Sequence, residues 1–215
     1  MTAQYWEDIS IDGMTAGMTS RPLDAWLAKQ SPPLDMEAIC PCFTTALWRG
    51  YIGQWRITDN QLWLDRMTRD TETSGERLGA PAAELIFANN GQSLPMEVDM
   101  RLIFDGNAGP IDCDWFTGKL RLPLEPALVY VHMGWASTYR YERILHIRQG
   151  RVVRERHIDH TVRFLAAYGD LHRVLTERDH PEDRIGLQGL TSLTDEGRIL
   201  VAEHLGLVPI RHEEP

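Results

Sequence analysis

The chain has too few cysteines for a disulfide-rich protein, and it has no apolar run long enough for a membrane-spanning protein. It has three cysteines, Cys40, Cys42 and Cys113, and an odd number without an export signal argues against a disulfide framework. Cys40 and Cys42 are one residue too close for a C-x-x-C pair, and no second pair completes a zinc site. No stretch approaches the roughly 20 apolar residues of a membrane span. We therefore expect a globular chain that needs neither disulfides nor a metal.

The beginning of the sequence and its motifs exclude further classes. The segment MTAQYWEDIS lacks the basic start and apolar stretch of a secretory signal, so we expect a cytoplasmic protein without a membrane partner. The sequence contains no phosphate-binding P-loop and no G-x-G-x-x-G motif after a strand. No cofactor and no metal are therefore predicted.

Basic residues are outnumbered by acidic ones, 22 to 31, which gives a formal net charge of −9. Nucleic-acid binding needs cations that displace counterions from phosphates, so this balance argues against a nucleic-acid partner. Residues 140–156 are a local exception, because they contain six arginines. We interpret these arginines as outward-facing strand residues, with an anion or RNA surface as the alternative.

Two-residue alternation between residues 48 and 158 predicts a sheet. Residues 51–58 and 61–67 form a predicted hairpin around Asp59 and Asn60, which tolerate left-handed backbone. Further strands are predicted near residues 9–11 and over 98–104, 111–123, 127–133, 141–148 and 151–158. Because these strands are joined by short turns, we expect an antiparallel meander that is curled or closed like a barrel.

Helical spacing brackets this sheet. Ser20 followed by Pro22 predicts a helix start, and Leu23, Trp26 and Leu27 share one face. The period becomes helical again after residue 161, with a second helix capped by Thr194 and ending at Gly206. The predicted fold class is α+β, with a β-rich domain over 1–160 and a helical C-terminal extension over 161–215.

Three clusters carry candidate site residues. Arg49 lies between aromatics in WRGY, where it could bind an anion or pair with a buried acid. Asp114, with Asp112, could hold a cation, provide acid–base chemistry or pair with Arg49. His132, Tyr139 and Glu142 lie in and just after HMGWASTY, and could transfer protons or pack as a bend between two strands. The packed bend is the preferred interpretation.

Three segments together resemble a known family. ALWRGYIGQWRITDNQLWL, DWFTGKLRLP and YVHMGWASTYRYE occur in this order and are followed by a G-R-V-V turn. The set resembles an uncharacterised bacterial family of hypothetical proteins with WRGYxxxW, DWFxGxL and YVHMGxxSxYxxE motifs. The resemblance covers roughly residues 9 to 155. It implies that the clusters belong to one module, and it implies no activity.

The sequence favours a protein-binding or interaction module, because seven tryptophans exceed what a core usually needs and aromatic residues anchor interfaces. The alternative is a hydrolase or lyase for a small polar substrate, with Arg49, Asp114, His132, Tyr139 and Glu142 in one catalytic pocket. A small-ligand carrier is the third possibility. The predicted partner is thus a protein or a small polar ligand. A homo-oligomer is a further possibility.

Overall fold

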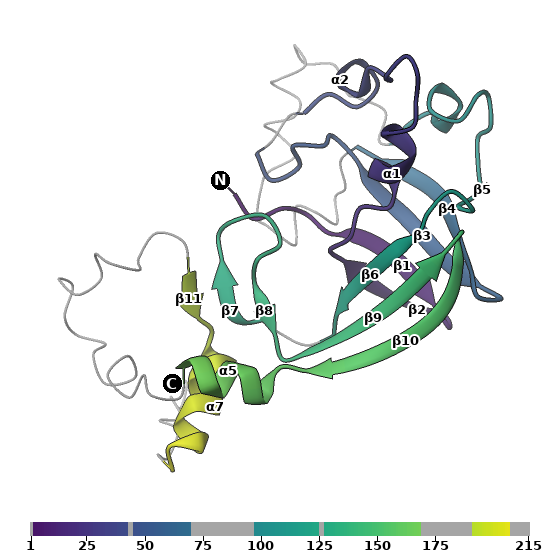
Figure 1. Ribbon diagram of the computed structural model, residues 1–215. Helices are drawn as coiled ribbons and strands as arrows, with labels where there is room; N and C mark the ends of the chain where they lie inside the picture. Colours follow the sequence, from purple (N-terminus) through teal and green to yellow (C-terminus); the bar gives the residue numbers. More distant parts are fainter. Residues whose placement is uncertain (1, 43–44, 70–96, 125–126, 169–190, 207–215) are drawn as a thin grey trace. The chain divides into compact units, whose positions relative to one another are not determined.

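The computed structural model describes residues 2–42, 45–69, 97–124, 127–168 and 191–206 (Figure 1). Strand dominates these residues, and the predicted mainly antiparallel sheet is confirmed. The chain divides into two compact units. The larger unit is Gln4–Leu122 with Ile144–Arg156, and the smaller is Met1–Ala3, Pro123–Arg143 and His157–Pro215. The predicted boundary after residue 160 stays a prediction.

The larger unit contains most of a sheet with the order β2-β1-β3-β4-β10-β9-β6, in which β5 also pairs with β4. Strands β6, β9 and β10 give residues to both units. The strands are β1 (Glu7–Ile11), β2 (Met14–Met18), β3 (Ile52–Thr58), β4 (Gln61–Thr68), β5 (Ile111–Asp112), β6 (Gly118–Pro123), β9 (Tyr141–Arg148) and β10 (Arg151–Asp159).

The order of the strands departs from a simple meander in one important place. β1 lies between β2 and β3, and its pairing with β3 is parallel, with Asp8 opposite Gln54 and Ile11 opposite Ile57. The sequence predicted a single short strand in this region, whereas the structure has a β1–β2 hairpin. Because β1 lies between β2 and β3 in the sheet, the acidic first residues of β1 lie beside β3.

The sheet is not closed, so the barrel alternative is wrong. One backbone hydrogen bond, 3.0 Å from the Thr19 nitrogen to the Arg121 oxygen, links the end of β2 to β6. The hydroxyl of Ser20 accepts from the Arg121 nitrogen at 2.9 Å, and Ser20 does not cap a helix as predicted. The short helix α1 (Leu23–Leu27) follows Pro22 instead and has no side-chain cap.

The predicted hairpin is confirmed as β3 and β4, with Thr58 paired to Gln61. Asp59 and Asn60 have φ values of 53° and 61°, as a two-residue turn that matches strand twist requires. Strands β9 and β10 turn in the same manner at Gln149 and Gly150.

The predicted strand over residues 98–104 is wrong. A 3₁₀ turn, η1 (Met100–Leu102), occupies this segment, and the Asp99 side chain caps it by accepting from the Arg101 nitrogen. Met100, Ile103 and Phe104 are buried at a spacing of three and four residues, which fits a turn of helix rather than alternation. A further short helix, α2 (Met36–Ile39), is capped by Asp35.

In the part of the smaller unit that the structure describes there are a second sheet, β11-β7-β8, and two helices. Its elements are β7 (Ala127–Val131), β8 (Thr138–Tyr139), α5 (Thr161–Tyr168), β11 (Thr191–Leu193) and α7 (Asp195–His204). Thr194 caps α7 as predicted, because its hydroxyl accepts from the Gly197 nitrogen at 3.1 Å. Leu128, Phe164 and Val201 belong to the core of this unit. The part of the predicted helical segment between residues 169 and 190 lies outside the described residues.

Candidate functional site

A short loop before β3, residues 45–50, is held tightly in the larger unit. Leu47 packs in a buried cluster with Tyr5 and Ile52. The Gly50 nitrogen donates to the Leu47 oxygen at 2.9 Å, and Gly50 has a φ of +76°. A Cβ atom at Gly50 would lie 1.9 Å from the carbonyl oxygen of Cys40, so only glycine fits there.

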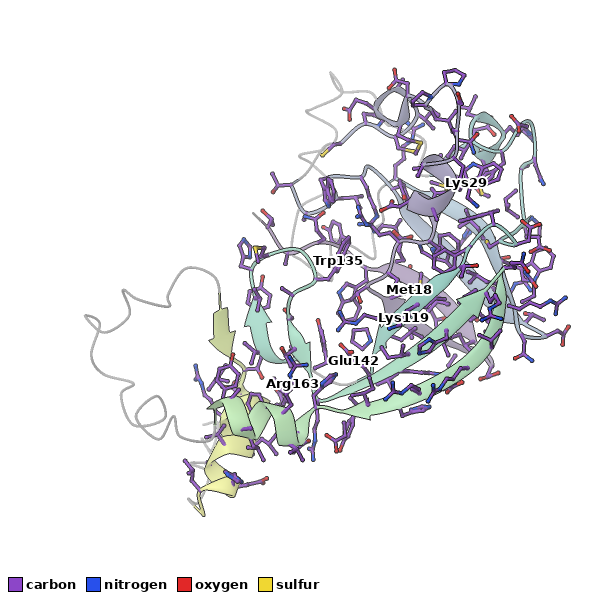
Figure 2. All side chains as sticks on the ribbon, viewed as in Figure 1. Met18, Lys29, Lys119, Trp135, Glu142 and Arg163 are labelled. Atoms are coloured by element: carbon purple, nitrogen blue, oxygen red, sulfur yellow. The ribbon has the colours of Figure 1, made fainter. Side chains whose placement is uncertain are left out.

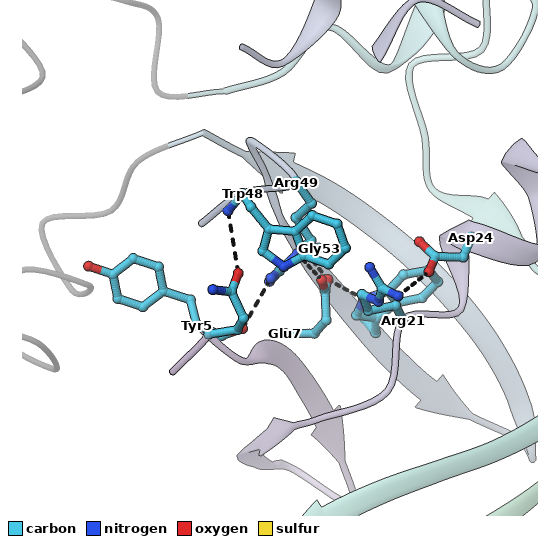
Figure 3. Close-up of polar contacts among 9 residues, drawn as sticks. Tyr5, Glu7, Arg21, Asp24, Trp48, Arg49 and Gly53 are labelled. Atoms are coloured by element: carbon cyan, nitrogen blue, oxygen red, sulfur yellow. Dashed lines mark hydrogen bonds and ion pairs between the residues drawn. The ribbon is translucent and has the colours of Figure 1, made fainter. Parts of the chain in front are cut away.

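Arg49 in this loop pairs with a buried carboxylate, Glu7 on β1 (Figure 3). Arg49 Nε lies 2.8 Å from Glu7 Oε1, and the side chains are 5% and 1% exposed. The other Glu7 oxygen accepts from the Gly53 nitrogen at 2.5 Å and from Trp55 Nε1 at 3.0 Å. Arg49 also donates to the Tyr5 oxygen at 3.1 Å. The sequence offered Asp112 and Asp114 as possible partners of Arg49; the structure finds Glu7 instead.

The electrostatics of this cluster follow from its burial. Burial raises the pKa of Glu7, while the charge of Arg49 and the hydrogen bonds from Trp55, Gly53 and Arg49 oppose the rise. Burial, together with the negative charges of Glu7 and Asp24, also raises the pKa of Tyr51 well above its ordinary value. Arg49 therefore stabilises the fold through buried contacts. Its guanidinium also lies 5.5 Å from the Tyr51 ring centroid.

Trp48 contrasts with its neighbours, because it is 53% exposed while Leu47 and the Arg49 side chain are buried. The Arg21 guanidinium lies 5.1 Å from the Trp48 ring centroid, within cation–π range. Arg21 also forms an ion pair of 2.9 Å with Asp24 on α1 (Figure 3). Arg21, Asp24 and Trp48 are called here the Trp48 surface.

A second polar cluster lies within the smaller unit. Glu142 is 4% exposed, and its Oε2 lies 3.3 Å from His160 Nε2. Burial raises the pKa of Tyr139 to about 12, opposed by a hydrogen bond with Ser137 and assisted by the charges of Glu142 and Tyr130. A carboxylate, an imidazole and a phenol can together hold or move a proton.

The structure divides the five predicted site residues between the units. Arg49 and Asp114 are in the larger unit, and Asp114 is exposed at the surface. His132, Tyr139 and Glu142 are in the smaller unit, where Glu142 acts on Tyr139 electrostatically. His132 is exposed, and its Nδ1 lies 2.9 Å from the Tyr130 hydroxyl rather than near Glu142. A site that uses all five residues together stays a prediction.

Two residues of these clusters were missing from the predicted site. Glu7 shares the buried face of β1 with Ile9 and Ile11, so its position in the alternation could have revealed a buried acid. His160 follows the end of β10, and no local sequence pattern indicates its pairing with Glu142. This pairing depends on β9 and on the start of α5, which are separated in sequence.

The buried cysteines are unsuited to nucleophilic chemistry. Burial raises the pKa of Cys40 to about 11 and raises that of Cys113 further, with Asp112 adding to the rise. Both thiols therefore stay protonated at neutral pH. Among the residues that the structure describes, no group of three or more His, Cys, Asp or Glu could hold a metal ion.

The comparisons with known proteins provide no family. No family model, curated protein or solved structure matches this chain. The described helices include none with the length and apolar character needed to cross a membrane.

Proposed function

We propose that this protein is a binding module that docks a partner protein on the Trp48 surface. The observation that carries the proposal is the exposure of Trp48 on a loop that its buried neighbours hold in place. The buried Leu47, the Glu7–Arg49 pair and Gly50 each restrain the loop. Tryptophan and arginine are the residues most enriched at interface hot spots, and a preorganised contact loses little entropy on binding.

The chemistry of this surface suits a partner with an apolar pocket for the indole. Arg21 covers one side of Trp48, and Asp24 in turn engages Arg21, so the ring is held by a cation–π contact instead of by burial. Such a surface presents one large apolar ring inside a polar rim, which is the usual anatomy of a protein interface. Removing the ring would leave the rim intact.

A photo-cross-linking amino acid at Thr45 tests this function. Thr45 is exposed on the same loop, so the probe leaves Trp48 in place. In the native cells we expect one cross-linked partner, whose adduct disappears when Trp48→Ala is combined with the probe. Met14→Ala is the matched control, because Met14 is a 66% exposed apolar residue at the β1–β2 turn. An adduct that persists in Trp48→Ala, or one that Met14→Ala removes as completely as Trp48→Ala does, contradicts the proposal.

The second candidate function is proton transfer at the Glu142–His160 pair. It is favoured by one observation, a carboxylate that is 4% exposed and paired with an imidazole beside Tyr139. In this function Glu142 would hold and orient His160 as the general base, and Tyr139 would donate a hydrogen bond to the substrate. The reaction class would be hydrolysis or elimination on a small polar substrate.

Glu142→Gln separates this candidate from the binding function. Against a panel of small esters and hydroxy acids, an enzyme of this type would lose roughly 100-fold or more in rate when the carboxylate becomes an amide. Trp48→Ala would leave that rate unchanged. Absence of turnover by the wild-type chain, or equal turnover by Glu142→Gln, would rule out catalysis at this pair.

A further inference from the structure

Four basic residues gather on three neighbouring strands of the larger unit. They are Lys119 on β6 (labelled in Figure 2), His146 on β9, and Arg154 and Arg156 on β10, and together they are called the basic patch. β10, β9 and β6 are adjacent in the sheet. Partial burial and the positive charges of Lys119, Arg154 and Arg156 lower the pKa of His146. Three cations on neighbouring strands therefore act electrostatically on a single imidazole.

The charge of the basic patch is not neutralised within the described part of the chain. Lys119, Arg154 and Arg156 are exposed, and no ion pair or side-chain hydrogen bond joins them to another described residue. Elsewhere Arg56 pairs with Asp65 at 2.9 Å. Glu155 lies between Arg154 and Arg156 in sequence, but successive side chains of a strand point to opposite faces, so Glu155 does not lie on the face that the two arginines share. Like charges held close together repel one another, and a bound anion would relieve this repulsion.

The composition of the basic patch distinguishes between two kinds of anionic partner. A protein interface has an apolar, aromatic centre depleted in charge, whereas an interface with nucleic acid is polar and strongly positive. On β6, and on the parts of β9 and β10 in the larger unit, there is no Phe, Tyr or Trp, and Val153 is the one large exposed apolar side chain. The patch therefore resembles the second kind of interface.

We propose that the basic patch binds the phosphodiester backbone of a nucleic acid through Lys119, Arg154 and Arg156, without reading the bases. Arginine and lysine supply most contacts to phosphate oxygens, and such contacts position a strand without sequence information. The absence of Phe, Tyr and Trp leaves no platform on which bases could stack.

The net charge of −9 does not prevent this contact. At physiological ionic strength charges separated by more than about 8 Å are largely screened. A phosphate seated on the basic patch therefore responds mainly to the nearest cations. The sheet brings onto neighbouring strands cations that are up to 37 residues apart in sequence, from Lys119 to Arg156.

Fluorescence anisotropy with labelled RNA and DNA strands of about 16 nucleotides tests the proposal. We expect the full chain to bind at about 50 mM salt, with affinity that falls steeply by about 200 mM. The double variant Arg154→Gln/Arg156→Gln should bind roughly tenfold more weakly or worse, and the salt slope should decrease by about 0.7 per lost phosphate contact. On binding, the pKa of His146, followed by NMR, should rise because phosphates offset the neighbouring cations.

Arg101→Gln is the matched control, because it removes one exposed arginine on η1 away from β6, β9 and β10. It should bind like the wild type, as should Trp48→Ala, which separates this proposal from the protein-binding function. Comparison of RNA with DNA shows which source supplies the backbone. Failure of the wild type to bind either strand at low salt overturns the proposal. Equal binding by the double variant also overturns it, and so does equally effective competition by polyglutamate, which would assign the basic patch to an acidic polypeptide.

Discussion

Replacing Arg49 with methionine is expected to lower the free energy of unfolding by about 3–5 kcal/mol, because it leaves the Glu7 carboxylate buried without its partner. Urea denaturation measures this loss. Arg56→Met is the matched control. Its pair with Asp65 is more than one-third exposed on each side, so its loss should cost less than about 1 kcal/mol. Equal effects of the two substitutions would show that the Glu7–Arg49 pair is not the support of the loop.

The double variant Glu7→Gln/Arg49→Met should recover about 2 kcal/mol of that loss, because a neutral amide removes the buried charge. Its carbonyl oxygen can still accept from Gly53 and Trp55. Measuring Glu7→Gln alone completes the double-mutant cycle, which gives the coupling energy of the pair. A double variant that is less stable than Arg49→Met alone would contradict this assignment.

The loss in Arg49→Met should also depend on pH. Burial raises the pKa of Glu7 above its ordinary value of 4.5, and removing Arg49 takes away the main opposing charge. The folded state then holds a proton that the unfolded state releases, so stability falls as pH rises through the folded pKa. The variant should therefore be closer to the wild type at about pH 5 than at about pH 8.

Gly50→Ala is expected to be the second most damaging substitution, with a loss above about 3 kcal/mol. A left-handed backbone costs a residue with a Cβ about 1–2 kcal/mol. At Gly50 the new atom would also lie 1.9 Å from a backbone oxygen of Cys40, which cannot move as a side chain can. The loss of stability in Gly50→Ala is measured by thermal unfolding.

Gly13→Ala provides the control for this prediction. Gly13 has a φ of +78°, close to that of Gly50, but nothing lies within 4 Å of its Cβ position. It should cost about 1–2 kcal/mol, the conformational part alone. If the two variants lose the same stability, the close approach of Gly50 to Cys40 has no energetic weight.

The elements predicted best were those defined by local chemistry. Asp59–Asn60 and Gln149–Gly150 specify tight turns through left-handed backbone, and Thr194 specifies a helix start through its hydroxyl. Failures occurred where a distant residue took the polar group. Ser20 was predicted to cap a helix, but its hydroxyl accepts from Arg121, about 100 residues away. The parallel pairing of β1 with β3 is similarly non-local, and the residue periodicity does not indicate which strands pair.

The same distinction explains the candidate site. Arg49 was recognised as functional or buried from its aromatic neighbours, but its partner Glu7 is 42 residues earlier and meets it only because β1 pairs with β3. The tryptophan count predicted an interface without saying which ring is exposed. The structure distinguishes Trp55, 2% exposed beside Glu7, from Trp48, 53% exposed in the neighbouring loop.

The central claim is that an exposed indole, on a loop fixed by Glu7 and Arg49, forms the binding surface. The most direct test is to measure the affinity of the cross-linked partner for purified Trp48→Ala. Calorimetric titration should show affinity reduced roughly 30-fold or more relative to the wild type, as for a hot-spot residue, with Met14→Ala unchanged. Wild-type affinity in Trp48→Ala, with the fold intact, would contradict the claim.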